Sequence, residues 1–590
     1  MTEPGKPRNP KVGKLRPSQV VTQHGPGAVV DLPELSVIVA GTDHWWVSGI
    51  DRVFEPRLEA FLHVRALYRP PQPEPGKFGG LPSFVFPEWL VCPQCRLLAP
   101  FRNFHFRSSG EFMCTRNDAR HRGRPAAFPA RFMVACAAGH LDDFPWKEWV
   151  HGTGGTCPGP LELIDTGSSG SASDLIVKCT RCAKDKPLGD AFQKDAITGC
   201  TGRRPWLSLS HYEAGCGQSV KTILRGASNA YFSVVSSALS IPPWSDPIQQ
   251  DLAPYREALM RAKNLDHLRQ GIEGEFFGVG DLLQRYTVEQ LWKALRAEPE
   301  EEQDLKRPEY IAFLHPETRH ETKAEFEISP SPAPDRYSTQ FSSVVAASRI
   351  REVRALRGFT RIDSVPDLGE RTDVSELEIR IAPLGLKDVD WLPGIDLRGE
   401  GIFLQLNAAV LSEWEGRETV ERESSRLAAQ FSEWRKSRSM DERPFPGMRY
   451  VLLHTLAHAL IRQFALDCGY SSSALRERIY CKTGADAMAG LLIYTASTDS
   501  DGSLGGLVAQ AAPDRLGPLL TGALHESAFC ASDPLCGGGD IGAATNLNGA
   551  ACHACLLLAE TSCEFGNRLL DRATLVNTLG DRGMAFFGTT

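Results

Sequence analysis

The sequence predicts a multidomain protein of mixed α/β class, built from α+β domains. Three observations support this class. The chain has 590 residues, more than a single hydrophobic core normally holds. Its 16 cysteines gather in two parts of the sequence and are missing from residues 217–467. Runs of β-branched residues also alternate with segments whose apolar residues recur at helical spacing. We expect four regions, at residues 1–90, 91–225, 226–445 and 446–590.

The composition is that of a globular protein, with 42% hydrophobic residues, 23% charged residues and a net charge of -7. Because the whole chain is acidic, contact with nucleic acid would have to come from local basic patches. No stretch reaches the ~20 apolar residues that span a bilayer, and the N-terminus lacks the apolar core of a secretory signal. We therefore expect a cytoplasmic protein without a membrane partner. The reducing cytoplasm disfavours disulfides and favours metal ligation by cysteine.

Residues 1–90 are expected to form a flexible basic arm, up to about residue 20, followed by a β-rich segment. Two β-branched runs flank Gly25-Pro26-Gly27, which predicts a strand, a turn and a second strand. A connector rich in proline and glycine begins at Arg69 and leads to the cysteine-rich region.

Residues 226–445 are predicted to be mostly helical. Apolar residues recur at helical spacing over residues 282–295, and the charged segment from Glu413 predicts a long solvent-facing helix. In the last region, the apolar segment after Pro444 predicts a buried helix. The run "MAGLLIYTAS" from Met488 predicts a central strand.

The cysteines of the second region predict metal sites. Cys179 and Cys182 form a C-x-x-C pair, and Cys200 and Cys216 follow it. Four thiolates at tetrahedral corners suit Zn²⁺, so this spacing predicts one structural zinc site. Four ordinary buried cysteines are the alternative.

A less regular set of cysteines precedes this one. Cys92 and Cys95 form another C-x-x-C pair, and Cys114 supplies a third thiol. Three candidates for the fourth ligand remain open: His121, Cys136 and His140. The last two, four residues apart, form a plausible ligand pair, although His140 could equally be a hydrogen-bonded structural residue. Together the two sets predict a zinc-ribbon-like N-terminal half.

A third set of thiols lies near the C-terminus. Five cysteines compete there for what we expect to be one ion: Cys530, Cys536, Cys552, Cys555 and Cys563. Haem attachment requires C-x-x-C-H, which Leu556 excludes, and a redox pair would not need the neighbouring thiols. Structural zinc is favoured, and the three sets together predict two to three Zn²⁺ ions.

Motifs for catalysis are incomplete. His454 and His458 share one helical face, but Thr455 replaces the glutamate of the H-E-x-x-H zinc-protease motif. Packing or hydrogen bonding of the two histidines is the favoured interpretation. Asp499 and Asp501 follow a predicted strand and could bind Mg²⁺ in a nuclease, but the lysine and further carboxylate of that class are missing from the strand. The Walker-type G-x-x-x-x-G-K-[ST] motif is also absent from the sequence.

Two arginine-rich stretches are candidate nucleic-acid surfaces. The candidate DNA-binding residues are Arg102, Arg107, Arg116, Arg120, Arg122 and Arg124 in the first stretch, and Arg349, Arg351, Arg354 and Arg357 in the second. Phenylalanines are interleaved with the first set, so guanidinium groups could bind phosphates while rings stack on bases. A solvated charged face is the alternative for either stretch.

Several ordered motifs carry a family resemblance. They include "LRPSQVVTQHGPGAVVDLPELSVIVAG", "MVACAAGHLDDFPWKEWVH", "IREVRALRGFTRI", "LLHTLAHALI" and "CHACLLLAETSCEFGNRLLDR". These motifs resemble the DrmB family, the helicase-associated component of the DISARM anti-phage defence system, and the resemblance runs over nearly the whole chain.

The region from about Met448 also resembles the zinc-binding domain of MrfA-type repair helicases. This resemblance implies an Mrr-like, restriction-endonuclease-like α/β fold that lacks nuclease residues. The zinc ligands that it implies are Cys552, Cys555 and Cys563, with Cys530 or Cys536 as the fourth. In the first cysteine set, Asn117 stands where the family often has another cysteine, which leaves His121 as the substitute ligand.

The resemblance further implies partners. A DrmA-type DNA helicase on a separate chain would carry the ATP site, and the DISARM system also includes a DNA methyltransferase. The expected function is a non-catalytic zinc-binding subunit that helps the helicase engage foreign DNA. Two alternatives stay open: a metal-dependent DNA nuclease that uses Asp499 and Asp501, and a purely architectural scaffold for protein–protein contacts.

Overall fold

A computed structural model provides the fold. It describes residues 15–33, 35–45, 51–72, 80–108, 110–167, 171–197, 199–244, 246–252, 255–274, 276–296, 304–315, 325–363, 381–387, 390–437, 443–495, 506–538, 547–580 and 582–588. Among these residues, no helix combines the length and the apolarity that crossing a lipid bilayer requires.

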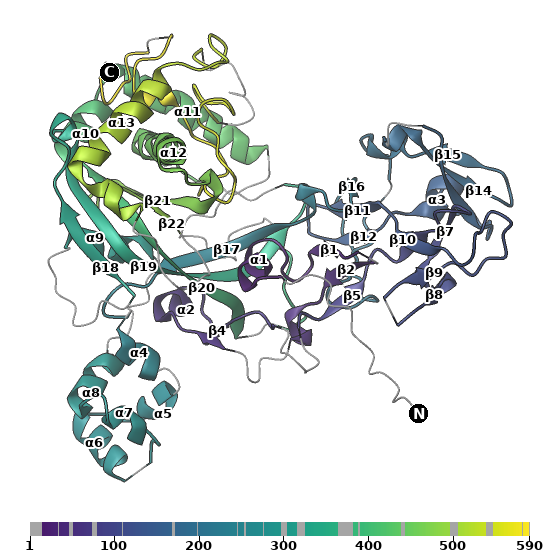
Figure 1. Ribbon diagram of the computed structural model, residues 1–590, viewed down its shortest axis with the longest axis horizontal. Coiled ribbons are helices and arrows are strands. Elements are labelled where there is room, and N and C mark those ends of the chain that lie inside the picture. Colours follow the sequence, from purple (N-terminus) through teal and green to yellow (C-terminus); the bar gives the residue numbers. More distant parts are fainter. Residues whose placement is uncertain are drawn as a thin grey trace.

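A long, mainly antiparallel sheet forms the centre of the molecule. Its main strands, in spatial order, are β17 (Phe232–Leu239), β19 (Phe341–Thr360), β20 (Trp391–Leu406), β22 (Met488–Thr495) and β21 (Leu475–Lys482). Three shorter strands extend it: β18 (Glu327–Ser331) pairs with β19, β4 (Ala66–Tyr68) with β20, and β3 (Arg52–Val53) with β4. Figure 1 shows the sheet running from the C-terminal helices at one end to the strand-rich N-terminal region at the other.

The strands β19 and β20 are the longest of the described fold, at 20 and 16 residues. They lie in the part of the chain predicted to be mostly helical, so that prediction is wrong for the strands β18, β19 and β20. The apolar pattern is hard to recognise there because charged side chains stand at buried positions of β19, including Arg351 and Glu352. These charges are paired inside the protein, which makes their burial tolerable.

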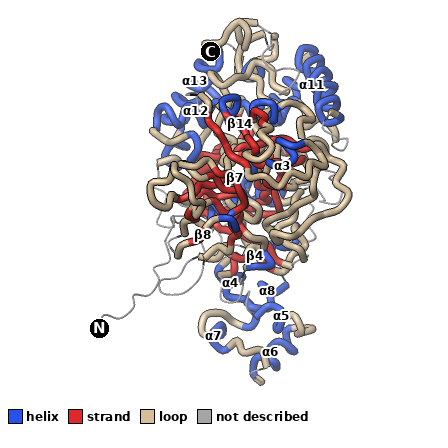
Figure 2. Tube along the Cα trace, turned by 90° about the vertical axis from the view of Figure 1, so that its right-hand side faces the viewer, coloured by secondary structure: helices blue, strands red, loops and turns tan. Residues whose placement is uncertain are grey.

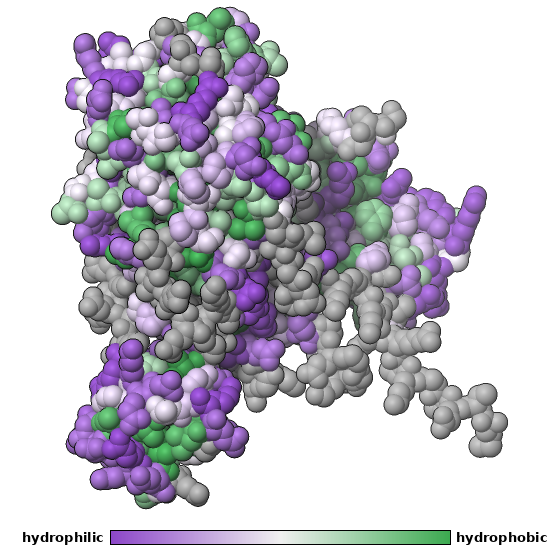
Figure 3. All heavy atoms as spheres, turned by 60° about the vertical axis from the view of Figure 1, so that its left-hand side comes forward, coloured by the Kyte–Doolittle hydropathy of each residue, from purple (hydrophilic) through white to green (hydrophobic). Residues whose placement is uncertain are grey.

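Helices in the same region form a small separate body. It consists of α4 (Pro247–Leu252), α5 (Arg256–Leu259), α6 (Leu265–Glu273), α7 (Gly280–Leu283) and α8 (Val288–Arg296), which share their own apolar core. Figures 1 and 2 show this body protruding from one end of the molecule, and Figure 3 shows apolar side chains on its surface, where Phe276 is 83% exposed. The next helix, α9 (Lys306–Leu314), packs against the strands β21 and β22.

Three sheets build the N-terminal region. The largest contains, in order, β15 (Asp185–Pro187), β14 (Leu175–Cys179), β13 (Leu161–Asp165), β7 (Leu97–Pro100), β6 (Trp89–Val91), β10 (Ala126–Pro129), β9 (Phe112–Met113) and β8 (His105–Phe106). The second contains β12 (Leu141–Asp143), β11 (Phe132–Cys136) and β16 (Val220–Leu224), and the third contains β1 (Val29–Asp31), β2 (Ser36–Val39) and β5 (Ser83–Val85).

The hairpin of β1 and β2 only partly matches the expected strand, turn and strand. The first β-branched run, which includes Val20 and Val21, lies in the helix α1 (Pro17–Thr22) instead. Pro17 stands at the first helical position, where its missing N–H costs nothing. A second short helix, α2 (Pro56–Phe61), follows β3.

The C-terminal helices are α10 (Ala408–Glu415), α11 (Glu418–Lys436), α12 (Met448–Cys468) and α13 (Pro513–Ala528). The prediction of a buried helix after Pro444 is confirmed by α12, which packs against α13, β21 and β22. The predicted central strand is confirmed as β22. The charged segment from Glu413 is divided into α10 and α11, and α11 buries a stripe that includes Leu427 and Phe431 rather than facing solvent all round.

Candidate metal centres

The first candidate centre consists of Cys92, Cys95, Cys114 and His121, which we call the Cys92 group. Its C-x-x-C pair lies in the turn between β6 and β7, Cys114 follows β9, and His121 precedes β10. The Sγ atoms of Cys95 and Cys114 are 3.8 Å apart, and His121 Nε2 is 3.5 Å from Cys92 Sγ. Of the three candidates for the fourth ligand, the structure therefore brings His121 to this group.

The other two candidates belong to a second centre. Cys136, His140, Cys200 and Cys216 form the Cys136 group. His140 Nδ1 lies 3.3 Å from Cys136 Sγ and 3.5 Å from Cys200 Sγ, and the sulfurs of Cys136 and Cys216 are 4.0 Å apart. On its other side, His140 Nε2 is 2.9 Å from Glu213. Such a carboxylate fixes the ring orientation of a metal-binding histidine.

Glu213 is itself held in its ionised form. Hydrogen bonds from Arg204 and then from His140 lower the pKa of Glu213 to about 2. The hydrogen bond between Cys200 and Cys136 similarly lowers the pKa of Cys136. The same hydrogen bond raises the pKa of Cys200, so the thiolate is favoured at Cys136 rather than at Cys200, while Glu213 stays the carboxylate behind the histidine.

A third centre contains a histidine and a cysteine that the sequence did not single out as ligands. It consists of His151, Cys157, Cys179 and Cys182, which we call the Cys157 group. The sulfurs of Cys157 and Cys179 are 3.8 Å apart. His151 ends the helix α3 (Trp146–His151), where its Nδ1 donates to the main-chain oxygen of Lys147, 3.0 Å away. Among the described residues, its buried Nε2 has no hydrogen-bond partner, so this nitrogen is available to ligate a metal.

The spacing of four cysteines predicts one set, made of Cys179, Cys182, Cys200 and Cys216. The structure instead places the first two in the Cys157 group and the last two in the Cys136 group. Strand pairing is the reason. In the β13–β14 hairpin, Leu161 lies opposite Cys179, which brings the preceding Cys157 close. In the β11–β16 pair, Cys136 lies opposite Val220, which brings Cys216 close to Cys136 instead.

The fourth centre is the Cys530 group, made of Cys530, Cys536, Cys552 and Cys555. The sulfurs of Cys530 and Cys552 are 3.5 Å apart, those of Cys536 and Cys555 3.7 Å, and those of Cys552 and Cys555 3.8 Å. Both candidates for the fourth thiol therefore belong here, and Cys563 does not. Cys563 lies beside His454, His458 and Glu477 instead.

The four groups fit Zn²⁺. With Zn–S bonds of about 2.3 Å, ligand sulfurs at tetrahedral corners are about 3.8 Å apart, close to the distances seen here. All cysteines are free, so none of these contacts is a disulfide. Main-chain N–H groups donate to the sulfurs of Cys92, Cys200 and Cys530 at 3.4 Å each, which favours the thiolate form that binds metal.

The proposed DNA-binding arginines divide into buried and exposed residues. Arg351 and Arg354 are only 5% and 3% exposed. Arg351 bonds Asp396 at 3.3 Å, and Arg354 pairs with the buried Glu352 at 2.5 Å. The prediction that these two bind DNA is therefore wrong, because their guanidinium groups form ion pairs inside the central sheet. Arg349 is exposed and Arg357 is partly buried.

The first stretch lies at the surface. Five of its candidate arginines are exposed, and Arg116 is half-buried: the exposed ones are Arg102, Arg107, Arg120, Arg122 and Arg124. Arg116 and Arg120 are paired with acids, since Arg120 contacts Asp118 at 2.7 Å and both Arg116 and Arg120 contact Glu162 at 3.1 and 3.0 Å. Their charges are therefore largely balanced within the protein.

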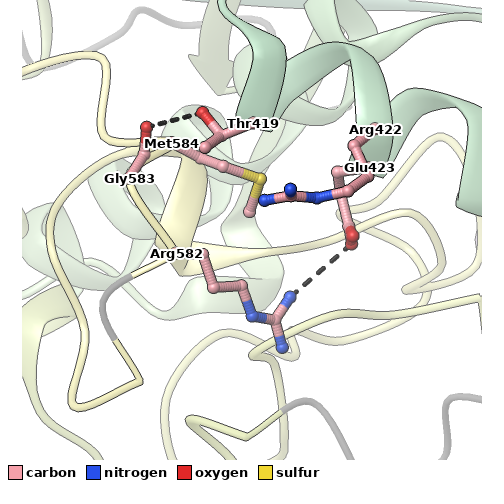
Figure 4. A pocket seen from close by; sticks show the side chains of 6 residues that line it. All are labelled: Thr419, Arg422, Glu423, Arg582, Gly583 and Met584. Carbon is pink, nitrogen blue, oxygen red and sulfur yellow. Dashed lines mark hydrogen bonds and ion pairs between the residues drawn. The ribbon is translucent and has the colours of Figure 1, made fainter.

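The residues of the nuclease alternative, Asp499 and Asp501, lie outside the described residues. A surface cavity of about 490 Å³ beside α11 is lined by Thr419, Arg422, Glu423, Arg582, Gly583 and Met584 (Figure 4). Thr419 donates to the Gly583 oxygen at 2.9 Å, and Arg582 pairs with Glu423 at 3.5 Å. These contacts attach the C-terminal segment to α11, and the described lining offers neither a nucleophile–base pair nor a metal-binding set.

Known proteins resemble this chain at both ends and along its length. Residues 16–232 match a domain of unknown function (DUF8724), and residues 456–556 match the MrfA Zn-binding domain. The chain is 34% identical over 578 residues to the DISARM protein DrmB of Bacillus paralicheniformis. The aligned region covers 94% of this chain and 98% of that protein. The crystal structure of the DUF1998 helicase MrfA bound to DNA aligns at 11% identity and a TM-score of 0.19, covering 35% of this chain and 21% of that one. Because the match to DrmB spans nearly the full length of both proteins, the chain belongs to the DrmB family of DISARM proteins, with an MrfA Zn-binding domain near its C-terminus.

Proposed function

We propose that the chain is a non-catalytic, zinc-stabilised subunit of DISARM anti-phage defence that associates with a separate DrmA-type DNA helicase and helps it engage foreign DNA. The observation that carries this proposal is a basic groove flanked by two of the cysteine–histidine groups, in a member of the DrmB family. The partners are expected to include other DISARM components, among them the methyltransferase.

Each of the four groups would hold one structural zinc ion, which raises the expected number above the two to three predicted from spacing. Every group offers four ligand atoms that lie within 4.8 Å of one another. Four protein ligands fill a tetrahedral coordination shell, so no position is left for a reacting water, as is typical of structural rather than catalytic zinc. The ions would fix loops that short strands alone could not hold.

The groove has a volume of about 460 Å³ and lies between the Cys92 group and the Cys157 group. Arg102, Arg116 and Lys147 contribute its cations, and Trp89 and Leu97 contribute apolar surface. Among the described residues, no acidic side chain lines it. Because Arg116 is paired with Glu162, Arg102 and Lys147 are the cations best placed to meet a DNA phosphate.

The test is a double charge reversal, Arg102→Glu with Lys147→Glu, in the chain complexed with its helicase. We expect DNA affinity to fall at least about tenfold at low salt, and the slope of log K against log salt to become shallower by about 0.9 for each duplex phosphate that the protein no longer neutralises. Arg422→Glu on α11 is the matched control, since this exposed arginine lines the cavity of Figure 4 instead. Equal affinity in the reversed and control complexes would remove the groove from the proposed function.

The catalytic alternative needs its own assay. The chain alone, incubated with Mg²⁺ or Mn²⁺ and labelled DNA, should leave the DNA intact. Cleavage that disappears in Asp499→Ala would favour the nuclease instead.

A further inference from the structure

A fifth set of side chains meets between α12, β21 and the C-terminal segment. His454 and His458 stand one helical turn apart on α12, Glu477 comes from β21, and Cys563 follows the Cys530 group in sequence. His454 Nε2 is 3.0 Å from Glu477 Oε1 and 3.1 Å from Cys563 Sγ. His458 Nε2 is 3.5 Å from the same glutamate oxygen. The two histidines and Glu477 have fully buried side chains.

The hydrogen bonds of His458 show which of its nitrogens carries a lone pair. Its Nδ1 is 2.9 Å from the main-chain oxygen of Leu556, which can only accept, so the ring hydrogen of the neutral form must be on Nδ1. The Nε2 lone pair then points at the Glu477 carboxylate, which is also an acceptor. Two acceptors in a buried site repel each other unless a metal cation lies between them or the ring takes up a second proton on Nε2. A carbonyl behind the opposite nitrogen is also the usual support of a metal-binding histidine.

Other polar atoms of this set lack hydrogen-bond partners. Within the described part of the chain, His454 Nδ1, His458 Nε2 and Glu477 Oε2 are buried without a hydrogen bond. Three unsatisfied polar atoms in one place are unusual, since buried polar groups are nearly always paired. Glu477 Oε1, by contrast, accepts from the N–H of Glu564 at 2.9 Å, which fixes the position of this carboxylate.

The sulfur of Cys563 resembles the sulfurs of the other groups. It accepts main-chain N–H bonds from Phe565 at 3.3 Å and from Asn567 at 3.1 Å. Such bonds favour a thiolate. With neutral histidines, the set then carries two negative charges, one on Cys563 and one on Glu477. Burying two anions without a cation is strongly unfavourable, so a divalent cation is the natural complement.

We propose that His454, His458, Glu477 and Cys563 hold a fifth metal ion, a structural Zn²⁺. Imidazole and thiolate ligands favour zinc over the hard ions Mg²⁺ and Ca²⁺, and four protein ligands close the coordination shell. The ion would cross-link the buried helix α12, the sheet and the C-terminal segment. This site is independent of the proposed function, because it needs neither the helicase nor DNA.

The test compares the zinc content of the full-length chain with that of Cys563→Ser and His458→Gln. We expect each variant to lose one zinc ion per chain while the ions of the four other groups remain. Cys468→Ser is the matched control, since this cysteine ends α12 and belongs to none of the five groups. Unchanged zinc content in a folded Cys563→Ser chain would overturn the proposal and favour a network of protonated histidines.

A second measurement covers the case in which the variants do not fold. The chain with its natural sequence is alkylated under three conditions: without a chelator, with a chelator, and after Zn²⁺ is returned. The alkylated cysteines are identified by mass spectrometry. We expect Cys563 to react after chelation and to become protected when Zn²⁺ is returned. Equal reactivity of Cys563 under all three conditions would overturn the metal site, whatever happens at the four sulfur-rich groups.

Discussion

His458 donates its Nδ1 hydrogen to the main-chain oxygen of Leu556, 2.9 Å away. Leu556 directly follows Cys555, a member of the Cys530 group, whereas the opposite nitrogen of His458 faces Glu477. One imidazole therefore connects the Cys530 group to the set formed by His454, His458, Glu477 and Cys563. The set beside His458 should therefore bind metal less tightly when the Cys530 group is disrupted.

This connection predicts coupling between the two C-terminal sites. Replacing Cys530 and Cys536 by serine should release the zinc of the Cys530 group and also weaken zinc binding beside His458, because Leu556 loses its fixed position. The rate of zinc transfer to a chelator measures this effect. The pair Cys179→Ser and Cys182→Ser, in a distant group, serves as the control and should leave the His458 site unchanged.

The division of the N-terminal ligands gives a second prediction. Cys182→Ser with Cys200→Ser should remove two zinc ions per chain, because the structure assigns these cysteines to different groups. Cys179→Ser with Cys182→Ser should remove only one, since both changes damage the same group and cannot act additively. Metal analysis distinguishes the two cases. Loss of a single ion in both double variants would restore the grouping suggested by sequence spacing.

Glu213 should control zinc affinity without contacting the ion. Its carboxylate holds His140 at 2.9 Å, so Glu213→Gln is expected to speed zinc loss from the Cys136 group by about 10- to 100-fold. Zinc release to a chromogenic chelator provides the measurement. Glu148→Gln, an exposed change on α3, is the comparison. Identical release from both variants would mean that Glu213 has no supporting role.

Arg354 should matter for stability rather than for DNA. Arg354→Ala leaves the buried carboxylate of Glu352 without its partner, which should lower the free energy of unfolding by about 3–5 kcal/mol. Arg349→Ala removes an exposed arginine of the same strand and should cost far less. Denaturant unfolding measures both. Reduced DNA affinity of the folded Arg354→Ala chain, with stability unchanged, would return this residue to the DNA surface.

The C-terminal core elements were predictable from sequence, and the long strands were not. The apolar segments of α12 and β22 have few interruptions, so their patterns are clear. In β19 the buried Arg351 resembles a surface residue in the sequence, because its ion-pair partner Asp396 lies 45 residues away, on β20. Local patterns cannot reveal a partner of this kind.

The candidate ligands were visible as residue types, but their grouping was not. Spacing along the chain placed Cys179 with Cys200, whereas strand register places Cys179 with Cys157. The sequence gives no sign that His151 is a ligand, because it joins the Cys157 group only where the end of α3 meets the β13–β14 hairpin. The four-residue spacing of His454 and His458 was the clue to the fifth set, although its two remaining members come from distant segments.

The zinc content of the full-length chain, purified under reducing conditions and checked for folding by circular dichroism, tests the structural basis of the proposed function most directly. We predict five zinc ions per chain, four in the sulfur-rich groups and one beside His458, with the four retained in Cys563→Ser. A stably folded chain that contains no zinc, or fewer than four ions, would contradict the zinc-built subunit proposed here.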